Sequence, residues 1–380
     1  MTQYDYIILG AGAAGLQVAW TMSHDPFFQN KKILLVDKVI KEGNDRTWCF
    51  WEKGKGNWDD ILEASWKTAV FKSIDFHKKF DLKEYTYKML KSGKFYGYVL
   101  DRLSAKKNFT IIQGSVLSQT KYADGYKVNT SIGEFIGRVV LSSILDENVM
   151  KESQRDLWLA QHFKGWYIKT DRPSFNSSEV IMMDFDIPQG ANTRFMYVLP
   201  VNETEALVEY TLFSKDILAD AEYDKAIEVY LESLDISNYQ IEETEFGVIP
   251  MTTFPFDKRN DDGLVFIGTA GGWTKASTGY TFYNSGKMAK KLCDYLKKGK
   301  SLKNFSADTR FAFYDKVMLD MLCRKNELGS EFFTSVYRHQ NISSILDFLH
   351  EESSILEEIK IVLQSSPRVE LLRSVRNVVF

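Results

Sequence analysis

The sequence predicts an α/β fold in which a Rossmann-type unit is interleaved with a second, mostly antiparallel sheet and is followed by C-terminal helices. Three observations predict it. A strand, a glycine-rich turn, a helix and another strand follow one another over residues 4–37, strands dominate residues 158–255, and a buried strand with its own glycine-rich turn returns at residues 263–272. Because the returning strand has the pattern of the first unit, we expect a distant piece of chain to complete that unit.

The composition is that of a folded chain with more than one core. The chain has 380 residues, 44% of them hydrophobic and 26% charged, and this length exceeds what one simple core usually supports. The formal net charge of -3 gives no electrostatic footprint for nucleic acid, which is therefore not an expected partner. Cys49, Cys293 and Cys323 lie far apart with no neighbour at metal-ligand spacing, so we expect free buried thiols in a reducing cytosol and no metal site.

The hydrophobic pattern gives the first unit a β-α-β beginning. In chain order it predicts a strand at residues 4–9, a helix at 13–24 that ends before Pro26, a strand at 32–37, a helix at 97–107 and successive strands over 109–144. Turns at Asp124-Gly125 and Ile132-Gly133 make the last strands a meander. Residues 6–22 are nearly all apolar, but spaced glycines and Gln17 favour neither a signal peptide nor a membrane-spanning helix.

The second sheet and the C-terminal region follow different patterns. Strands are expected at residues 165–170, 179–185, 194–201, 205–214 and 243–251, with a hairpin loop at 202–205 and a helix at 223–234. Helices are expected at residues 286–298, 313–322 and 342–349, before a last helical run that Pro367 breaks. We therefore assign residues 1–70, 98–150 and 260–300 to the dinucleotide unit, 71–97 and 151–259 to the substrate-binding sheet, and 301–380 to a helical region.

Residues 10–15, GAGAAG, form a dinucleotide-binding fingerprint together with the elements around them. We expect Gly10 to make the tight turn, Gly12 to let a pyrophosphate approach the backbone, and Gly15 to let the helix pack on the strand. The N-terminus of the helix offers free N–H groups and positive potential to the phosphates, and Asp37, at the end of the next strand, accepts from ribose hydroxyls.

The order of the elements favours FAD over NAD. An NAD dehydrogenase continues through ordered β-α units, whereas this chain runs into a meander and returns only at GLVFIGTAGG, residues 263–272. Such a late return is typical of FAD-binding folds of the hydroxylase and reductase type. The sequence has no second glycine fingerprint for a nicotinamide, so we expect NADPH to act as an external reductant.

Four ordered segments resemble the flavin-containing lycopene β-cyclases of carotenoid-making bacteria. They are DRTWCFWE after the second strand, FMYVLPVNETEALVEYTLFS in the second sheet, GVIPM, and GTAGGWTKASTGYTFYNS after the returning strand. The resemblance runs in order from residue 4 to about residue 325. It implies an enzyme that binds reduced FAD and closes the ends of lycopene into β-ionone rings, through γ-carotene to β-carotene, with no net redox change.

The resemblance also implies partners and a location. The implied substrate is lycopene or a related acyclic carotenoid, other enzymes of the carotenoid pathway are candidate partners, and the protein is expected in the cytoplasm, peripherally attached to the cytoplasmic membrane. Residues 287–305, KMAKKLCDYLKKGKSLKNF, are basic with apolar residues at helical spacing, which suits an anionic membrane surface. A solvated face on an ordinary helix is the alternative interpretation of that lysine run.

Glu209 is the candidate catalytic acid. On a strand, Leu207, Glu209 and Thr211 share one face, which is either solvated or buried; burial would raise the pKa of the carboxyl group so that it holds a proton near neutral pH. The resemblance places the essential acid of the family's motif on Glu209, while Tyr210 replaces the second acid of that motif. Asp184 and Asp186 also lie among apolar residues, but their spacing before a proline turn favours turn and face positions.

The cofactor-binding residues that we assign come from the fingerprint, from the segments after the second strand and from the returning turn: Gly10, Ala11, Gly12, Ala13, Ala14, Gly15, Asp37, Lys38, Arg46, Gly268, Gly271, Gly272, Thr278, Gly279 and Tyr280. Two departures from the related pattern occur in the returning turn. Lys275-Ala276 stand where relatives often have His-Pro, and Thr269 follows Gly268 where flavin hydroxylases usually have an acid. Trp48, Trp51, Trp273 and Tyr280 either line a tunnel for a polyene or fill the core.

Two other classes of function share these features. A flavin-dependent hydroxylase or prenyl-lipid reductase would consume NADPH and change the mass of its substrate, whereas a cyclase leaves the mass unchanged. A carrier of carotenoid or flavin would hold its ligand without turnover and would not depend on Glu209.

Overall fold

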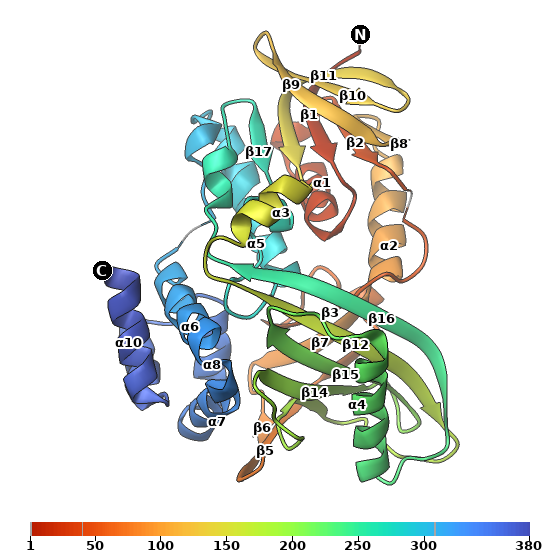
Figure 1. Ribbon diagram of the computed structural model, residues 1–380. Coiled ribbons are helices and arrows are strands. Elements are labelled where there is room, and N and C mark those ends of the chain that lie inside the picture. Colours follow the sequence, from red (N-terminus) through yellow and green to blue (C-terminus); the bar gives the residue numbers. More distant parts are fainter. Residues whose placement is uncertain (1, 40, 308) are drawn as a thin grey trace.

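A computed structural model of the chain describes residues 2–39, 41–307 and 309–380. It contains a Rossmann-type unit, a second large sheet, a small sheet between them and a group of helices from the C-terminal part of the chain (Figure 1). The predicted α/β class is therefore confirmed, with the two large units interleaved along the sequence.

The Rossmann-type unit is built on parallel strands in the order β8-β2-β1-β11-β17, and β10 and β9 extend β11 as an antiparallel meander. The strands are β1 (Thr2–Leu9), β2 (Ile33–Asp37), β8 (Phe109–Gln113), β9 (Val116–Tyr122), β10 (Gly125–Thr130), β11 (Gly133–Ser142) and β17 (Leu264–Phe266). The helices are α1 (Ala13–His24), α2 (Ser92–Ser104), α3 (Glu147–Ser153) and α5 (Phe282–Lys297). Residues 33–36 are buried on both faces, which is why β2 reads as an unbroken apolar run.

Strand β11 explains how the meander returns to the first unit. Its first half pairs antiparallel with β10, and its last residues pair parallel with β17, the strand that returns from residue 264. The predicted elements of this unit are confirmed, except that α2 begins at Ser92 rather than near residue 97 and that α3 was not predicted.

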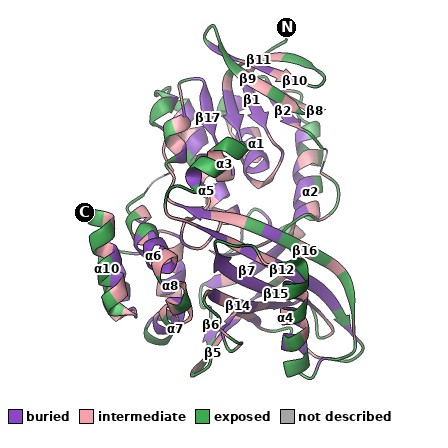
Figure 2. Cartoon of the chain, viewed as in Figure 1, coloured by how far each residue is buried: buried purple, intermediate pink, exposed green. Residues whose placement is uncertain are grey.

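The second large sheet has the order β16-β12-β15-β14-β13-β5-β6 and is antiparallel apart from the β13–β5 pair. Its strands are β5 (Thr68–Ser73), β6 (Phe76–Asp81), β12 (Trp158–Thr170), β13 (Val180–Asp184), β14 (Thr193–Pro200), β15 (Glu205–Ser214) and β16 (Tyr239–Thr252), and helix α4 (Asp220–Ser233) crosses it. Tyr223 and Ile227 of α4 pack on Val208 and Leu212 of β15, so α4 covers one face of the sheet. Figure 2 shows β15 buried and the outer side of α4 exposed.

A small sheet, β3-β7-β4, connects the two units. It consists of β3 (Thr47–Lys53), β4 (Ala64–Trp66) and β7 (Tyr85–Lys91), none of which was predicted as a strand. Phe50 and Leu90 belong to the core of the Rossmann-type unit, whereas Trp51 and Tyr87 belong to that of the second sheet. The boundaries that we expected between the dinucleotide unit and the substrate-binding sheet, near residues 70 and 97, fall inside β5 and α2.

The C-terminal region is helical, as predicted. It contains α6 (Ala312–Arg324), α7 (Gly329–His339), α8 (Ile342–Leu349), α9 (Ile355–Gln364) and α10 (Arg368–Val379), and Pro367 separates the last two. Val317, Met318 and Phe333 share one core with Leu207 and Phe213 of β15, so the helices close the face of the second sheet that α4 leaves open. No helix among the described residues is both long and apolar enough to cross a membrane.

Candidate functional site

The glycine-rich turn between β1 and α1 has the geometry of a phosphate cradle. Gly10 has a φ of +97°, which a side chain would strain, and a Cβ on Gly15 would lie 1.9 Å from the carbonyl oxygen of Gly10. A Cβ on Gly12 would meet no atom within 4 Å, so open space faces that residue. Helix α1 begins there without a side-chain cap and without an acidic residue in its first turn. The turn therefore presents uncapped helix N–H groups to an open space that suits an anion.

The other predicted contacts of the dinucleotide are distributed around this turn. The Asp37 carboxylate accepts a hydrogen bond of 2.5 Å from the backbone N–H of Ala11, which holds the acid at the cradle. Lys38 is exposed and does not line the cavity described below. Arg46 lines that cavity and donates to the carbonyl oxygens of Asp45 and Phe246 at 2.8 and 3.1 Å.

The returning turn brings a second group of glycines to the same place. Gly268, Gly272 and Gly279 have φ values of +60°, +73° and +72°, and a Cβ on Gly268 would lie 2.8 Å from the Cβ of Ala14 in α1. Gly271 has a packing role, because a Cβ there would lie 2.1 Å from the carbonyl oxygen of Phe266. The sequence-distant turn thus packs closely on the first helix.

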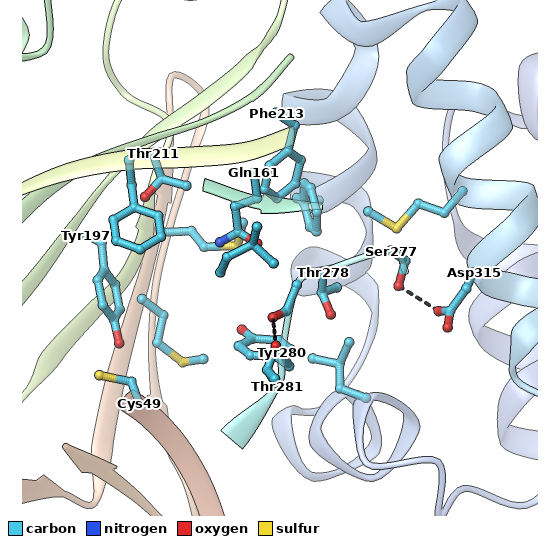
Figure 3. A pocket seen from close by; sticks show the side chains of 18 of the residues that line it. Cys49, Gln161, Tyr197, Thr211, Phe213, Ser277, Thr278, Tyr280, Thr281 and Asp315 are labelled. Atoms are coloured by element: carbon cyan, nitrogen blue, oxygen red, sulfur yellow. Dashed lines mark hydrogen bonds between the residues drawn. The ribbon is translucent and has the colours of Figure 1, made fainter. Parts of the chain in front are cut away.

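A cavity of about 810 Å³ extends from these two turns into the space between the second sheet and the C-terminal helices (Figure 3). At the cofactor side its lining includes Ala13, Arg46, Thr278, Gly279 and Tyr280. The remaining residues assigned to the cofactor, Gly10, Ala11, Gly12, Ala14, Gly15, Asp37, Lys38, Gly268, Gly271 and Gly272, do not line it.

Two buried polar atoms on this wall have no hydrogen-bond partner among the described residues, namely Thr278 Oγ1 and Gln161 Oε1. Both side chains line the cavity, and they lie close to each other, because a Cβ on Gly279, the residue after Thr278, would lie 2.1 Å from Gln161 Oε1 (Figure 3). Buried polar atoms are normally paired, so these two atoms fit a ligand with its own hydrogen-bonding groups. The flavin ring of FAD is such a ligand. The two glycine turns described above fit the pyrophosphate and the adenosine part of the same molecule.

Glu209 lies on β15 with its side chain in the wall of the cavity. Leu207, Thr211 and Phe213 line the same cavity, as the period of a strand requires, while the alternate residues pack under α4. Glu209 is 8% exposed, and its Oε1 accepts a hydrogen bond of 2.6 Å from Thr211 Oγ1. Of the two environments that the sequence left open for this face, the buried one is therefore correct.

A second carboxylate, Glu245, lies beside Glu209. Gly165 of β12, the strand between β16 and β15, pairs with Glu209 on one side and with Glu245 of β16 on the other. A Cβ on Gly165 would lie 3.2 Å from Glu245 Cγ and 3.5 Å from Glu209 Cβ, so the missing side chain leaves the two carboxyl groups facing each other. Thr47 Oγ1 donates to Glu245 Oε2 at 2.7 Å. Glu245 was not predicted from the sequence, although Gly165, a glycine inside a long strand, was a signal that neighbouring groups approach closely there.

Burial raises the pKa of both carboxyl groups, and the charge of Glu245 raises the pKa of Glu209 further. For Glu209, burial is the larger cause and the charge of Glu245 is the next. For Glu245, burial again dominates, although β16 is an edge strand and the residue as a whole is partly exposed. Two like charges at this separation in a dry wall are unfavourable, so the pair keeps a proton near neutral pH.

The two other acidic residues considered in the sequence, and the tyrosine at the position of the family's second acid, have structural roles. Asp184 forms an ion pair of 3.3 Å with Lys72 and accepts from Tyr230 at 2.9 Å. Asp186 lies after β13, where its backbone N–H donates to Asp184. Tyr210, at the position of the family's second acid, points into the cluster under α4 and accepts from Arg194 at 3.2 Å. None of these three side chains lines the cavity.

The residue that replaces the expected histidine is buried and paired. Lys275 forms ion pairs of 3.0 Å with Asp315 of α6 and with Glu351, and Ser277 donates to Asp315 at 2.6 Å, as Figure 3 shows for the last pair. These contacts tie the returning turn to the C-terminal helices. Asp315 lines the cavity, but its charge is balanced by Lys275.

Two of the four predicted aromatic residues line the cavity, and the apolar residues of the basic helix α5 are buried. Trp48 and Tyr280 line the cavity, whereas Trp51 and Trp273 are buried in the cores. In α5, the apolar residues Ala289, Leu292 and Leu296 are buried in the Rossmann-type core. The basic helix therefore exposes lysines but no apolar face for insertion into a membrane.

Comparisons with known proteins agree with this architecture. The model of the family described as "Lycopene cyclase protein" matches residues 5–374. No curated protein matches the sequence significantly.

Similar solved structures support the fold. A geranylgeranyl bacteriochlorophyll reductase-like protein from Thermoplasma acidophilum is 14% identical, with a TM-score of 0.63 and 100% of both chains covered. A flavoprotein/dehydrogenase from Cytophaga hutchinsonii is 12% identical, with a TM-score of 0.56, covering 91% of this chain and 92% of its own. A "probable FAD-dependent monooxygenase" from Pseudomonas aeruginosa is 10% identical, with a TM-score of 0.54, covering 91% and 99%.

Proposed function

This chain belongs to the lycopene cyclase protein family, and from that premise we propose that it is a lycopene β-cyclase that works with reduced FAD. It closes the linear ends of lycopene into β-ionone rings, through γ-carotene to β-carotene, without net redox change. NADPH is the external reductant in this proposal, and the enzyme works at the cytoplasmic membrane with other carotenoid-pathway enzymes as candidate partners.

The observation that carries the proposal is the carboxyl group of Glu209 in the wall of a largely apolar cavity, paired with Glu245 across Gly165. Cyclisation requires an acid that is still protonated near neutral pH and a site from which water is excluded. Burial and the second carboxylate meet the first requirement by raising the pKa of Glu209. The second is met by aromatic and aliphatic lining residues such as Phe195, Phe213 and Tyr337.

In the proposed reaction, Glu209 and Glu245 together give one proton to the substrate and take one proton back. Glu209 transfers its proton to a terminal carbon–carbon double bond and becomes a carboxylate. The next double bond attacks the resulting tertiary carbocation, which forms the new ring bond. A ring proton is then lost to the carboxyl pair, which restores the starting state, so the product has the mass of the substrate.

The cofactor is assigned to the cradle and the returning turn. Gly12 and the uncapped start of α1 would hold the pyrophosphate, Asp37 the ribose, and Thr278, Gly279 and Tyr280 the flavin end. When bound in its reduced form, FAD supplies negative charge that stabilises a nearby cation.

Expression in a lycopene-accumulating bacterial host, followed by pigment chromatography and mass spectrometry, tests the proposal. We expect ring-ended carotene of unchanged mass from the natural chain and a loss of about 10²- to 10⁴-fold for Glu209→Gln, the range for removing a general acid. Glu203→Gln, on the exposed hairpin loop before β15, is the matched control and keeps full conversion. Untouched lycopene despite FAD-loaded protein would exclude the cyclase, and a product of changed mass would indicate a flavin-dependent oxidoreductase.

A further inference from the structure

Helix α9 has its apolar side turned outward. Five apolar residues recur at helical spacing on the exposed side of this helix, namely Ile355 (62% exposed), Leu356 (79%), Ile359 (47%), Val362 (40%) and Leu363 (65%). The inward side instead holds Glu358, which is 1% exposed and accepts from Arg310 at 2.7 Å and from Tyr314 at 3.0 Å. A helix at the surface of a soluble protein normally shows the opposite arrangement.

Helix α10 continues the same surface. Val369 is 70% exposed and Leu372 is 69% exposed, while Leu371 and Ser374 on the other side of the helix are buried. Arg324 of α6 holds that buried side through hydrogen bonds to Ser374 at 2.7 Å and to Glu370 at 2.7 Å. The apolar residues of α10 therefore face outward while the helix is fixed to α6, and Figure 2 shows α10 largely exposed.

This outward surface is continuous with the cavity. Val362, Leu363 and Leu372 are exposed and also line the cavity that contains Glu209. The inner residues Ile361 and Leu371 of the same two helices line it as well. The gap between α9 and α10 is therefore a mouth of the cavity whose rim is apolar.

Cations are interspersed with the apolar residues. Lys360, Arg368 and Arg376 are exposed, and none of them forms an ion pair with a carboxylate in the part of the chain that the structure describes. Of the neighbouring carboxylates, Glu358 and Glu370 are paired with Arg310, Arg324 and Arg373, and Glu357, which lies near Lys360, accepts from Ser354 at the start of α9. The surface is therefore apolar with unpaired positive charge at its edge, which matches the boundary between acyl chains and anionic headgroups.

We propose that the outward face of α9 and α10, formed by Ile355, Leu356, Ile359, Val362, Leu363, Val369 and Leu372, inserts into the surface of an anionic lipid bilayer and opens the cavity toward the acyl chains. The exposed apolar residues and the cations beside them are the evidence for insertion, which does not depend on the proposed function. The delivery of substrate rests on the proposed function, because lycopene dissolves in the bilayer and not in water. A second copy of the chain on this face would bring the same cations together and would close the mouth.

Flotation of the FAD-loaded full chain with vesicles tests the insertion. We expect binding to phosphatidylcholine vesicles that contain phosphatidylglycerol, and weaker binding to phosphatidylcholine alone. The variant Leu356→Gln/Ile359→Gln/Val369→Gln changes residues that are outside the cavity lining. Each buried side chain of this size contributes about tenfold in a partition coefficient, so the triple variant should lose vesicle binding.

The matched control replaces three exposed apolar residues elsewhere. Ile74, Leu117 and Ile132 are 78%, 68% and 56% exposed, and Ile74→Gln/Leu117→Gln/Ile132→Gln should bind vesicles like the natural chain. Lys360→Gln/Arg376→Gln should lower binding to the anionic vesicles and remove the preference for them. The triple variant at residues 356, 359 and 369 is called the face variant below. Equal vesicle binding by the face variant and the natural chain would overturn the proposal. A natural chain that is a dimer in solution, with only the face variant monomeric, would overturn it as well.

A second measurement separates this inference from the proposed function. With lycopene held in vesicles, the face variant should convert far less than the natural chain, whereas with detergent-dispersed lycopene the two should be equal. Vesicle binding without any conversion by the natural chain would sink the cyclase assignment and leave the docking face standing. Loss of conversion by the face variant in detergent as well would overturn the role of the face in delivery.

Discussion

Glu209 of β15 and Glu245 of β16 face each other across Gly165 of β12, the strand that lies between them. The pKa of Glu209 is raised by burial and, next, by the charge of Glu245. A raised carboxyl pKa means that the acid form is present below that pKa and is lost as the pH rises through it, so kcat/KM should fall on the alkaline side. Glu245→Gln removes the repelling charge, and the alkaline limb should move to lower pH.

The pH profile of kcat/KM with detergent-dispersed lycopene measures this shift. Glu242→Gln, at an exposed position of the same strand, is the control and should leave the limb where it is. A limb that stays in place in Glu245→Gln would mean that the two carboxyl groups do not interact during turnover.

Only Glu209 was predicted from the sequence, because its apolar neighbours made it a candidate and the resemblance to the lycopene β-cyclases placed the essential acid on it. Glu209 lies in an apolar strand, and the spacing of Leu207 and Thr211 places all three on one face. Glu245 lies 36 positions later (245 − 209) in a strand with several charged residues, so its local pattern is that of a solvated edge. Only the pairing of β12 with both neighbours brings the two together, and single-sequence patterns do not encode which strands become neighbours.

At the scale of elements, Lys275 fixes the returning turn to α6 and to the loop after α8 through Asp315 and Glu351. Removing one member of a buried ion pair leaves an uncompensated charge and costs about 3–5 kcal/mol. We therefore expect Lys275→Met to lower the free energy of unfolding by that amount, measured by urea denaturation, and Lys275→Met/Asp315→Asn to recover part of it.

The matched control for this prediction is Lys225→Met, because Lys225 pairs with Glu228 on the exposed side of α4. An exposed pair contributes at most about 1 kcal/mol. A similar loss in both variants, or none in Lys275→Met, would contradict the structural role of the buried pair.

Elements with a strong period were predictable, and those that depend on partners were not. The strands β1, β2 and β15 and the helices α1 and α5 have clear apolar patterns, and the structure confirms them. The strands of the small sheet are short and irregular in pattern, because their two faces serve different cores. The apolar residues of α9 have the period of an ordinary amphipathic helix, so the pattern predicts a helix but not which face points inward. That orientation depends on Arg310 and Tyr314, which bind Glu358 on the inward side.

At the scale of the molecule, the candidate site exists only where the separate units meet. The cradle comes from residues 10–15, the flavin end from the returning turn, the acid from the second sheet, and the opposite wall from the C-terminal helices. The small sheet joins the cores of both large units, so each unit supports the position of the other. A ligand that contacts more than one of these parts should therefore stabilise the whole chain.

Two glycine substitutions in the cradle test that coupling through thermal unfolding with and without FAD. A ligand that binds only the folded chain stabilises it by RT ln(1 + [L]/Kd), about 2.7 kcal/mol at a concentration of 100 times Kd. Gly12→Ala adds a methyl group where a Cβ meets no protein atom within 4 Å, so the Tm without FAD should stay the same while the rise on adding FAD is lost. Gly15→Ala forces a Cβ to 1.9 Å from the carbonyl oxygen of Gly10, so its Tm should fall even without FAD. An undiminished rise with FAD in Gly12→Ala would place the pyrophosphate somewhere other than this turn.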